Sequence, residues 1–167
     1  VNIVTKNPGD TKKIETGASV GSFNAVSAMI KYSTRVKSSG IQSSFGYNSS
    51  EGHRFNADHE LLKGSIKMSK NLKEGRKLIG SIIASKSVNG HPGFVYPEKP
   101  ELVSYRRSDR DAVYVQGFYS HLFSHGTTWT TSFALNRFNT LYLDRKDTPE
   151  DEREGETRYF DWSLVSR

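Results

Sequence analysis

The chain has 167 residues, of which 34% are hydrophobic and 25% charged. Its length suits one domain, and its apolar share is lower than an ordinary globular core uses. No run approaches the roughly 20 apolar residues of a membrane helix, but the alternating strands of a transmembrane β-barrel need no such run. Cysteine is absent, which excludes disulfide scaffolds, thiol catalysis and zinc sites built on cysteine.

The net charge of +6 would suit nucleic acid, yet the basic residues form no single stripe and no nucleic-acid motif accompanies them. We therefore expect no nucleic-acid partner. The sequence has no supported Ser-His-Asp arrangement, phosphate loop or carboxylate pair, so we expect no enzyme, no catalytic residue and no cofactor. The histidines and carboxylates of residues 53–60 match no metal-ligand spacing, and we expect no metal site.

Apolar and polar residues alternate with a period of two through most of the chain, which is typical of strands with one apolar and one polar side. In the first such segment Ile14, Thr16, Ala18 and Val20 share one face. The predicted strands cover residues 13–20, 25–37, 41–48, 62–69, 77–85, 112–123, 129–143 and 157–165. The predicted fold is all-β, an antiparallel up-and-down meander of about eight strands.

Short and long connections alternate along this meander. Short glycine-containing turns are predicted at residues 38–40, 73–75 and 125–127. Long polar loops are predicted at residues 50–60, 89–111 and 145–156. All the long loops then emerge at one end of the sheet, as they do in outer-membrane barrels. The exception is the first connection, near Phe23, which is short where a longer loop would be expected.

The composition of the two faces indicates which of them meets water. The polar face carries serines and a basic set. That set is Lys31, Arg35, Lys63, Lys67 and Lys77. The apolar face is thin and rich in glycine, whereas a soluble core would require more large side chains. We expect the apolar face to meet lipid and the basic set to line a wet lumen, so that the meander is part of a transmembrane β-barrel.

Three segments resemble TonB-dependent outer-membrane receptors. Residues 1–6 (VNIVTK) resemble the last strand of the plug domain, which directly precedes the barrel. Residues 17–23 (GASVGSF) resemble the first barrel strand and its short loop. Residues 50–60 (SEGHRFNADHE) resemble the second-loop pattern Ser-x-Gly-x-Arg-x-Asn-x-Asp. The resemblance spans nearly the whole chain.

This resemblance implies a fragment of a larger receptor in the bacterial outer membrane. Residues 1–9 would be the end of the plug domain and a linker, and residues 10–167 the N-terminal part of a barrel of about 22 strands. The implied function is energy-coupled uptake of a scarce nutrient, with a ferric siderophore as the first expectation and haem or cobalamin as others. The implied partners are the TonB complex, through missing N-terminal parts, and outer-membrane lipid.

The third long loop supplies the candidate ligand-binding residues. Rigid aromatic side chains beside arginines are suited to binding an anionic ferric chelate by stacking and by charge. The candidates are Phe94, Tyr96, Tyr105, Arg106 and Arg107. In a receptor the basic lumen set would meet acidic groups of the plug or attract an anionic substrate.

Two other classes of protein remain open. Eight strands can close into a small outer-membrane barrel with a structural or adhesive role, which requires residues 13–20 to pair with residues 157–165. A soluble ligand-binding β-barrel would instead have an apolar interior and a polar outside.

Overall fold

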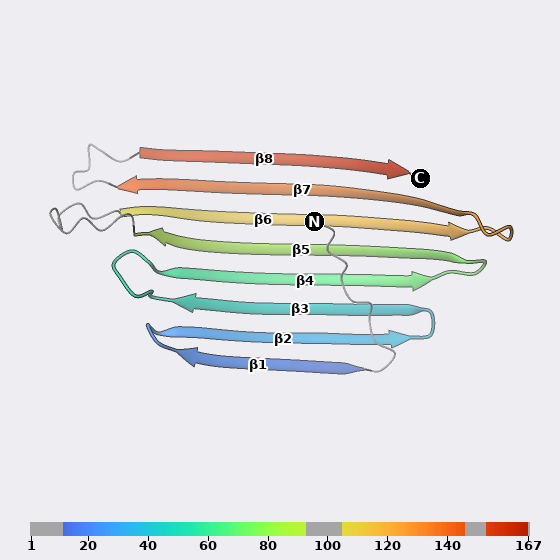
Figure 1. Ribbon diagram of the computed structural model, residues 1–167, viewed down its shortest axis with the longest axis horizontal. Helices are drawn as coiled ribbons and strands as arrows, with labels where there is room; N and C mark the ends of the chain where they lie inside the picture. The colour runs from blue at the N-terminus through green and yellow to red at the C-terminus, as the bar shows by residue number, and fades with distance from the viewer. Residues whose placement is uncertain (1–11, 93–104, 146–152, 167) are drawn as a thin grey trace.

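The computed structural model describes residues 12–92, 105–145 and 153–166. These residues form a single antiparallel sheet in which the eight strands follow one another in sequence order (Figure 1). The strands are β1 (Lys13–Gly21), β2 (Ala25–Val36), β3 (Ser39–Ser50), β4 (His59–Asn71), β5 (Arg76–His91), β6 (Tyr105–Leu122), β7 (Thr128–Arg145) and β8 (Arg153–Ser166). The predicted all-β, up-and-down meander is therefore confirmed.

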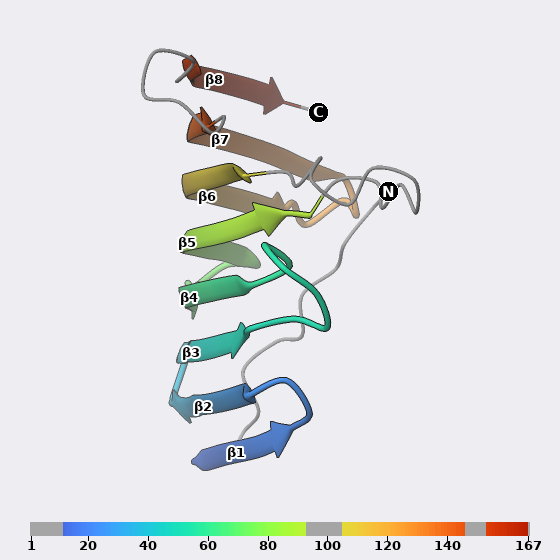
Figure 2. The ribbon, with the colours of Figure 1, turned by 90° about the vertical axis from the view of Figure 1, so that its left-hand side faces the viewer.

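The sheet is one layer deep and open. Figure 2 shows the strands stacked from β1 to β8, with these two strands at opposite edges. In the part of the chain that the structure describes, β1 does not pair with β8, so the closure that a small eight-stranded barrel requires is not formed. No helix among the described residues is long and apolar enough to cross a membrane.

The connections sort to the two ends of the sheet, as predicted. Residues 37–38, 72–75 and 123–127 make short turns at one end. Residues 22–24 and 51–58 join strands at the other end, where β5 and β7 also end and β6 and β8 begin (Figure 1). The first turn is shifted from its predicted place, because Gly40 pairs with Arg35 inside the sheet and the turn falls on Lys37 and Ser38.

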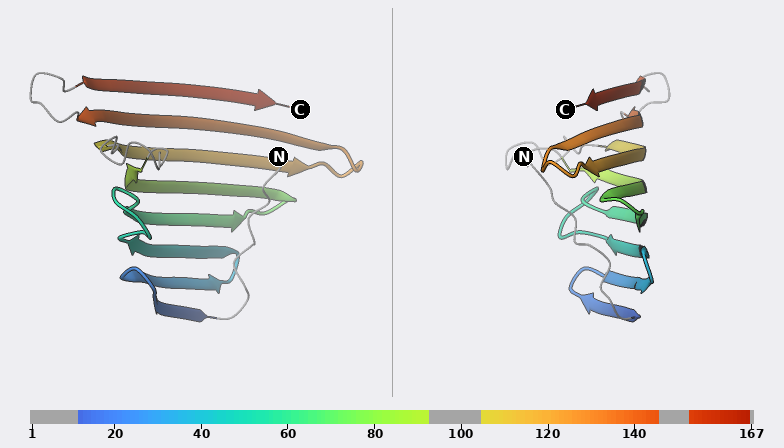
Figure 3. Two further views of the ribbon diagram at one scale, coloured as in Figure 1. Left: turned by 60° about the vertical axis from the view of Figure 1, so that its left-hand side comes forward. Right: turned by 90° about the vertical axis from the view of Figure 1, so that its right-hand side faces the viewer.

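The prediction of a long loop over residues 89–111 is wrong at both of its ends. β5 continues to His91 and β6 begins at Tyr105, so that Asn89 pairs with Ser108 and His91 with Arg106. β6 and β7 have 18 residues each, and Figure 3 shows them extending beyond their neighbours. Alternation fails to reveal these extensions because residues 106–111 are polar on both faces. For the same reason β4 begins at His59 and β8 at Arg153, inside segments predicted as loops.

The sheet has almost no hydrophobic interior. Ala112 is the only buried hydrophobic residue in the described ranges, and Ser108 and Thr140 are the buried polar ones. Main-chain pairing along the strands therefore holds the sheet together, rather than packing in a core. An ordinary globular domain packs two or more layers around a hydrophobic core, and this sheet does not.

We predict that Gly75→Ala destabilises the protein more than Gly126→Ala. Both glycines have positive φ, 69° and 86°, so each alanine carries a backbone strain of about 1 kcal/mol. A Cβ on Gly75 would also lie 2.8 Å from the Leu122 carbonyl oxygen, whereas one on Gly126 meets nothing within 4 Å. Urea unfolding of the two variants tests this, and equal losses of unfolding free energy would contradict the packing of this turn on β6.

Candidate functional site

The cross-strand register divides the side chains into two faces. We define the apolar face by the row of paired residues Ile14, Tyr32, Ser43, Ile66, Ile82, Val115, Leu135 and Trp162 and by residues in phase with them. The polar face is defined by the row Glu15, Lys31, Ser44, Ser65, Ile83, Tyr114, Asn136 and Asp161. All five residues of the predicted basic set lie in phase with the polar row, as the alternation predicts.

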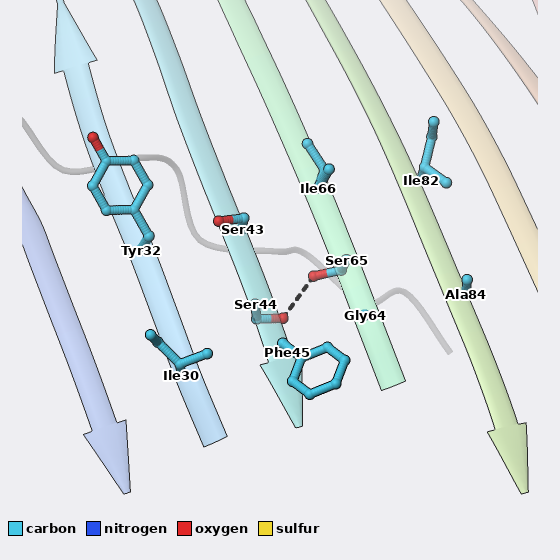
Figure 4. Close-up of a pocket in the computed structure, with 10 residues that line it drawn as sticks. All are labelled: Ile30, Tyr32, Ser43, Ser44, Phe45, Gly64, Ser65, Ile66, Ile82 and Ala84. Carbon is cyan, nitrogen blue, oxygen red and sulfur yellow. Dashed lines mark hydrogen bonds between the residues drawn. The ribbon is translucent and has the colours of Figure 1, made fainter. Parts of the chain in front are cut away.

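The apolar face is exposed. Ile30, Ile66 and Ile82 are 48%, 48% and 50% exposed, although a soluble barrel would bury them together at its centre. Figure 4 shows Ile30, Phe45 and Ile66, which come from three neighbouring strands and border a shallow hollow on this face. Such a continuous exposed apolar surface marks a face that another apolar phase or partner covers.

The polar face is the more sheltered of the two. Along β5, Ile79, Ser81 and Ile83 are half-buried, while Ile82 and Ala84 of the apolar face are exposed. β7 repeats the pattern over Ser132 to Phe138. A sheet that bends toward one face crowds the side chains on that face and spreads those on the other. The burial therefore favours a sheet that is concave on its polar face.

The apolar residues form a band that slants across the sheet. On β1 the band runs from Ile14 to Val20, and on β7 from Trp129 to Leu135. Successive pairing places Ile14 in the same row as Leu135. Ile14 is the end of the band nearer the short turns on β1, whereas Leu135 is the end farther from the short turns on β7. Between β1 and β7 the band is thus displaced by about 20 Å along the strands, while these two strands are about 29 Å apart across the sheet. If the band is set level, these distances incline the strands by about 35° from its perpendicular.

The polar face is predominantly basic. Lys31 lies opposite Glu15 on β1 and opposite Ser44 on β3. Lys63 and Lys67 follow on β4, Arg35 lies nearer the short turns on β2, and Lys77 lies on β5. Ser44 and Ser65 bridge β3 and β4 on this face through a 2.7 Å hydrogen bond between their hydroxyl groups (Figure 4). This face can attract an anion over several strands.

The connection between β3 and β4 folds down onto the extended β5–β6 pair. The Asn56 side-chain amide donates hydrogen bonds to the carbonyl oxygens of His91 (3.2 Å) and Arg106 (2.8 Å). The Arg107 guanidinium donates two hydrogen bonds to the Asp58 carboxylate, at 3.0 and 2.5 Å. These bonds are the main cause that holds the pKa of Asp58 below its ordinary value.

Four of the five named residues of the second-loop pattern have a structural role in this fold. The Ser50 hydroxyl accepts a hydrogen bond from the Gly52 amide and donates one to the Phe23 carbonyl. Gly52 has a φ of 77°, and a Cβ there would lie 2.6 Å from the Ala57 carbonyl carbon. Asn56 and Asp58 bind β5 and β6 as described. The pattern therefore encodes a loop conformation and its docking.

A second polar cluster lies on the polar face of the extended strands. The His91 ring stacks on Tyr142 with centroids 5.9 Å apart and hydrogen-bonds through Nε2 to Ser108, which is 1% exposed. Arg110 donates to the Tyr142 hydroxyl at 3.3 Å. Sequence reasoning missed this cluster because it placed these β5 and β6 residues in a loop. The polar residues 106–111 offered no periodicity that would have found it.

The predicted ligand-binding residues are not gathered in one loop. Phe94 and Tyr96 lie outside the described residues. Tyr105, Arg106 and Arg107 belong to β6, and their backbones pair with β7. The assignment of these three to a loop is wrong because the strand continues through them, and the Arg107 side chain is engaged with Asp58.

Comparison of the chain with protein-family models, with curated proteins and with solved structures finds no match.

We predict that Gly90→Ala releases the docked connection. A Cβ at Gly90 would lie 2.6 Å from the Asn56 Oδ1 atom and 2.8 Å from its carbonyl carbon, so residues 51–58 must move away. Tryptic cleavage after Arg54 should accelerate about tenfold if the loss of docking is about 1.4 kcal/mol. Gly80→Ala in the same strand is the matched control, because nothing lies within 4 Å of its added Cβ. Equal cleavage of the two variants would contradict the docking.

We predict that the Asp58–Arg107 pair makes stability depend on acid pH. The folded-state pKa of Asp58 is lowered from 3.8, so its contribution is full above that value and is lost as the pH falls through the folded-state pKa. The side chains are 36% and 39% exposed, which limits the contribution to about 0.5–1 kcal/mol.

Unfolding free energies of the wild type and of Asp58→Asn test this. Their difference should be constant near neutral pH and vanish in acid. Glu51→Gln in the same connection should have the unfolding free energy of the wild type at both neutral and acid pH. A difference that persists at low pH would contradict the ion pair as its cause.

Proposed function

We propose that the chain is part of the wall of a bacterial outer-membrane β-barrel, with its apolar face toward lipid and its polar face toward an aqueous lumen. The observation that carries this proposal is the exposure of the apolar side chains on a sheet without a core. Hydrocarbon covers such a surface without requiring complementary packing. The slant of the apolar band supports the same proposal, because a tilt of about 35° falls in the range of membrane barrels.

Within this class we propose a TonB-dependent receptor, which takes up a scarce nutrient such as a ferric siderophore. The support is the resemblance carried by residues 1–6, 17–23 and 50–60, together with the basic lumen set, which suits an anionic chelate. Energy would come from the TonB complex through parts of the receptor that precede this segment.

The other two classes are less well supported. A closed eight-stranded barrel requires pairing between the edge strands, and in the described residues β1 and β8 lie at opposite edges of the sheet. A soluble ligand-binding barrel requires an apolar interior, whereas Ile30, Ile66 and Ile82 are about half exposed.

Single-cysteine variants test the orientation, since the chain contains no cysteine of its own. We predict that a nitroxide at Ile82→Cys collides more with oxygen, which concentrates in lipid, than with a water-soluble nickel chelate. A nitroxide at the adjacent Ser81→Cys should show the opposite preference, because neighbouring residues of a strand point to opposite faces. Ile66→Cys and Ser65→Cys form a second pair on β4.

The protein should be measured as the full chain in membranes of a Gram-negative host. Nickel access at both Ile82 and Ile66, or the reverse preference within each pair, would contradict the proposed orientation. Uptake of a labelled ferric chelate by the complete receptor, lost when TonB is deleted, tests the transport proposal separately.

A further inference from the structure

We infer that the apolar face holds an anionic phospholipid in a groove along β3 and β4, with the lipid phosphate at Lys70, an inference that rests on the proposed orientation. Two shallow hollows of about 440 and 420 Å³ make up this groove. Ser43 and Gly64 line the first hollow, and Ser39 and Lys70 line the second. The groove therefore combines an apolar channel with a cation at one end.

Small residues on β3 and β4 hollow the apolar face at this place. Ser43 and Gly64, which have a small side chain or none, lie among larger side chains in the first hollow (Figure 4). The second hollow continues the first along the strands, because Ser43 of one and Ile41 of the other are successive residues of β3 on the same face. An acyl chain in such a channel has contacts on its sides as well as beneath it.

The length of the groove matches one leaflet of a bilayer. It runs from the row of Ser39 and Lys70 to the row of Phe45 and Gly64, a distance of about 20 Å along β3. With strands inclined by about 35°, this distance corresponds to about 16 Å along the membrane normal, close to half of a hydrocarbon core of about 30 Å. The Lys70 end lies beside the short turns, which face the periplasm in outer-membrane barrels. The groove therefore suits an acyl chain of the periplasmic leaflet.

Lys70 has no carboxylate among its neighbours on the apolar face. Its paired and diagonal neighbours in the strands carry either no charge or a positive one. They are Ser39, Ile41, Leu78, Gly80 and Arg76. Within the described ranges the Lys70 side chain forms no ion pair or hydrogen bond. The turn that carries Lys37 is held against β4, since the Asn71 amide donates to the Ser38 carbonyl oxygen at 2.7 Å, and it adds a second cation.

The carboxylates at the short-turn end are engaged with other cations. Among the described residues these are Glu15 and Glu74. Glu15 lies on the polar face and forms an ion pair with Lys13. Glu74 forms one with Arg76 at 2.7 Å. Lys70 is therefore an uncompensated cation, and an ammonium group at the end of an apolar groove matches both parts of an anionic phospholipid.

A tryptophan placed in the groove tests this inference. Tyr32 lines the first hollow about 14 Å from the row of Lys70, so Tyr32→Trp reports on the middle of a bound acyl chain. Trp129→Phe and Trp162→Phe remove the two native tryptophans. The full chain is reconstituted at pH 8, where histidines are neutral, in phosphatidylcholine vesicles. These contain a minor fraction of phosphatidylglycerol brominated midway along its acyl chains or, in the parallel sample, of phosphatidylcholine brominated at the same positions.

We expect phosphatidylglycerol to be enriched about fivefold in the groove, as one uncompensated cation predicts. Since bromine quenches emission on contact, the introduced tryptophan should be quenched more by phosphatidylglycerol than by the same fraction of phosphatidylcholine. Lys70→Gln should abolish this excess. Gly64→Leu should lower it by filling the hollow, because an added Cβ there has room.

Two matched controls separate the groove from general attraction of anionic lipid. Lys86→Gln removes one positive charge from the same face at the other end of the band, and it should leave the excess unchanged. Trp129, which lies on the same face of β7 toward the short turns, should not distinguish the two lipids when it is the one tryptophan retained.

Each other result overturns the inference. Equal quenching of the introduced tryptophan by the two lipids contradicts a lipid groove while leaving the membrane orientation standing. The same holds for an excess that also appears at Trp129, that is lost in Lys86→Gln, or that survives Lys70→Gln or Gly64→Leu. No quenching by either lipid contradicts both the groove and the proposed orientation.

Discussion

A single layer of β-sheet has two faces and no interior, so its apolar side chains must be covered by something outside the sheet. That constraint governs the whole chain. Apolar residues occupy one face from β1 to β8, and main-chain pairing provides the cohesion that a core provides elsewhere. In water such a surface would drive aggregation, and in a bilayer it is matched to its surroundings. Gly64 and Gly80 in the band are compatible with this, since an added Cβ would meet no atom closer than 4.0 Å and lipid does not require complementary packing.

Some strands continue beyond the apolar band, at the end of the sheet away from the short turns, and these extensions carry the candidate site. β5, β6 and β7 extend past their neighbours, and the connection of residues 51–58 binds to this extension through Asn56 and Asp58. The same extension carries the His91–Tyr142 stack on the polar face. The sheet and the docked connection therefore form one folded unit, and its extension presents ordered side chains on the polar face.

The sequence predicted the part of the fold in which one face is polar and the other apolar. Alternation located β1, β2 and the central parts of β4 and β5, and it assigned Lys31 and Lys67 to one face and Ile66 to the other. It failed where both faces are polar, as in Asn89 to His91 and in residues 106–111, because polar residues there show no alternation. The docking of Asp58 on Arg107 and the stacking of His91 on Tyr142 depend on contacts across many residues, which local patterns do not encode.

The central claim, that tilted strands cross a bilayer with the apolar face outward, is tested most directly by polarised infrared spectroscopy of the amide bands in oriented membranes. The slanted band predicts strands inclined about 35° from the membrane normal. Strands lying in the membrane plane, or a protein without preferred orientation in a well-ordered bilayer, would contradict the account.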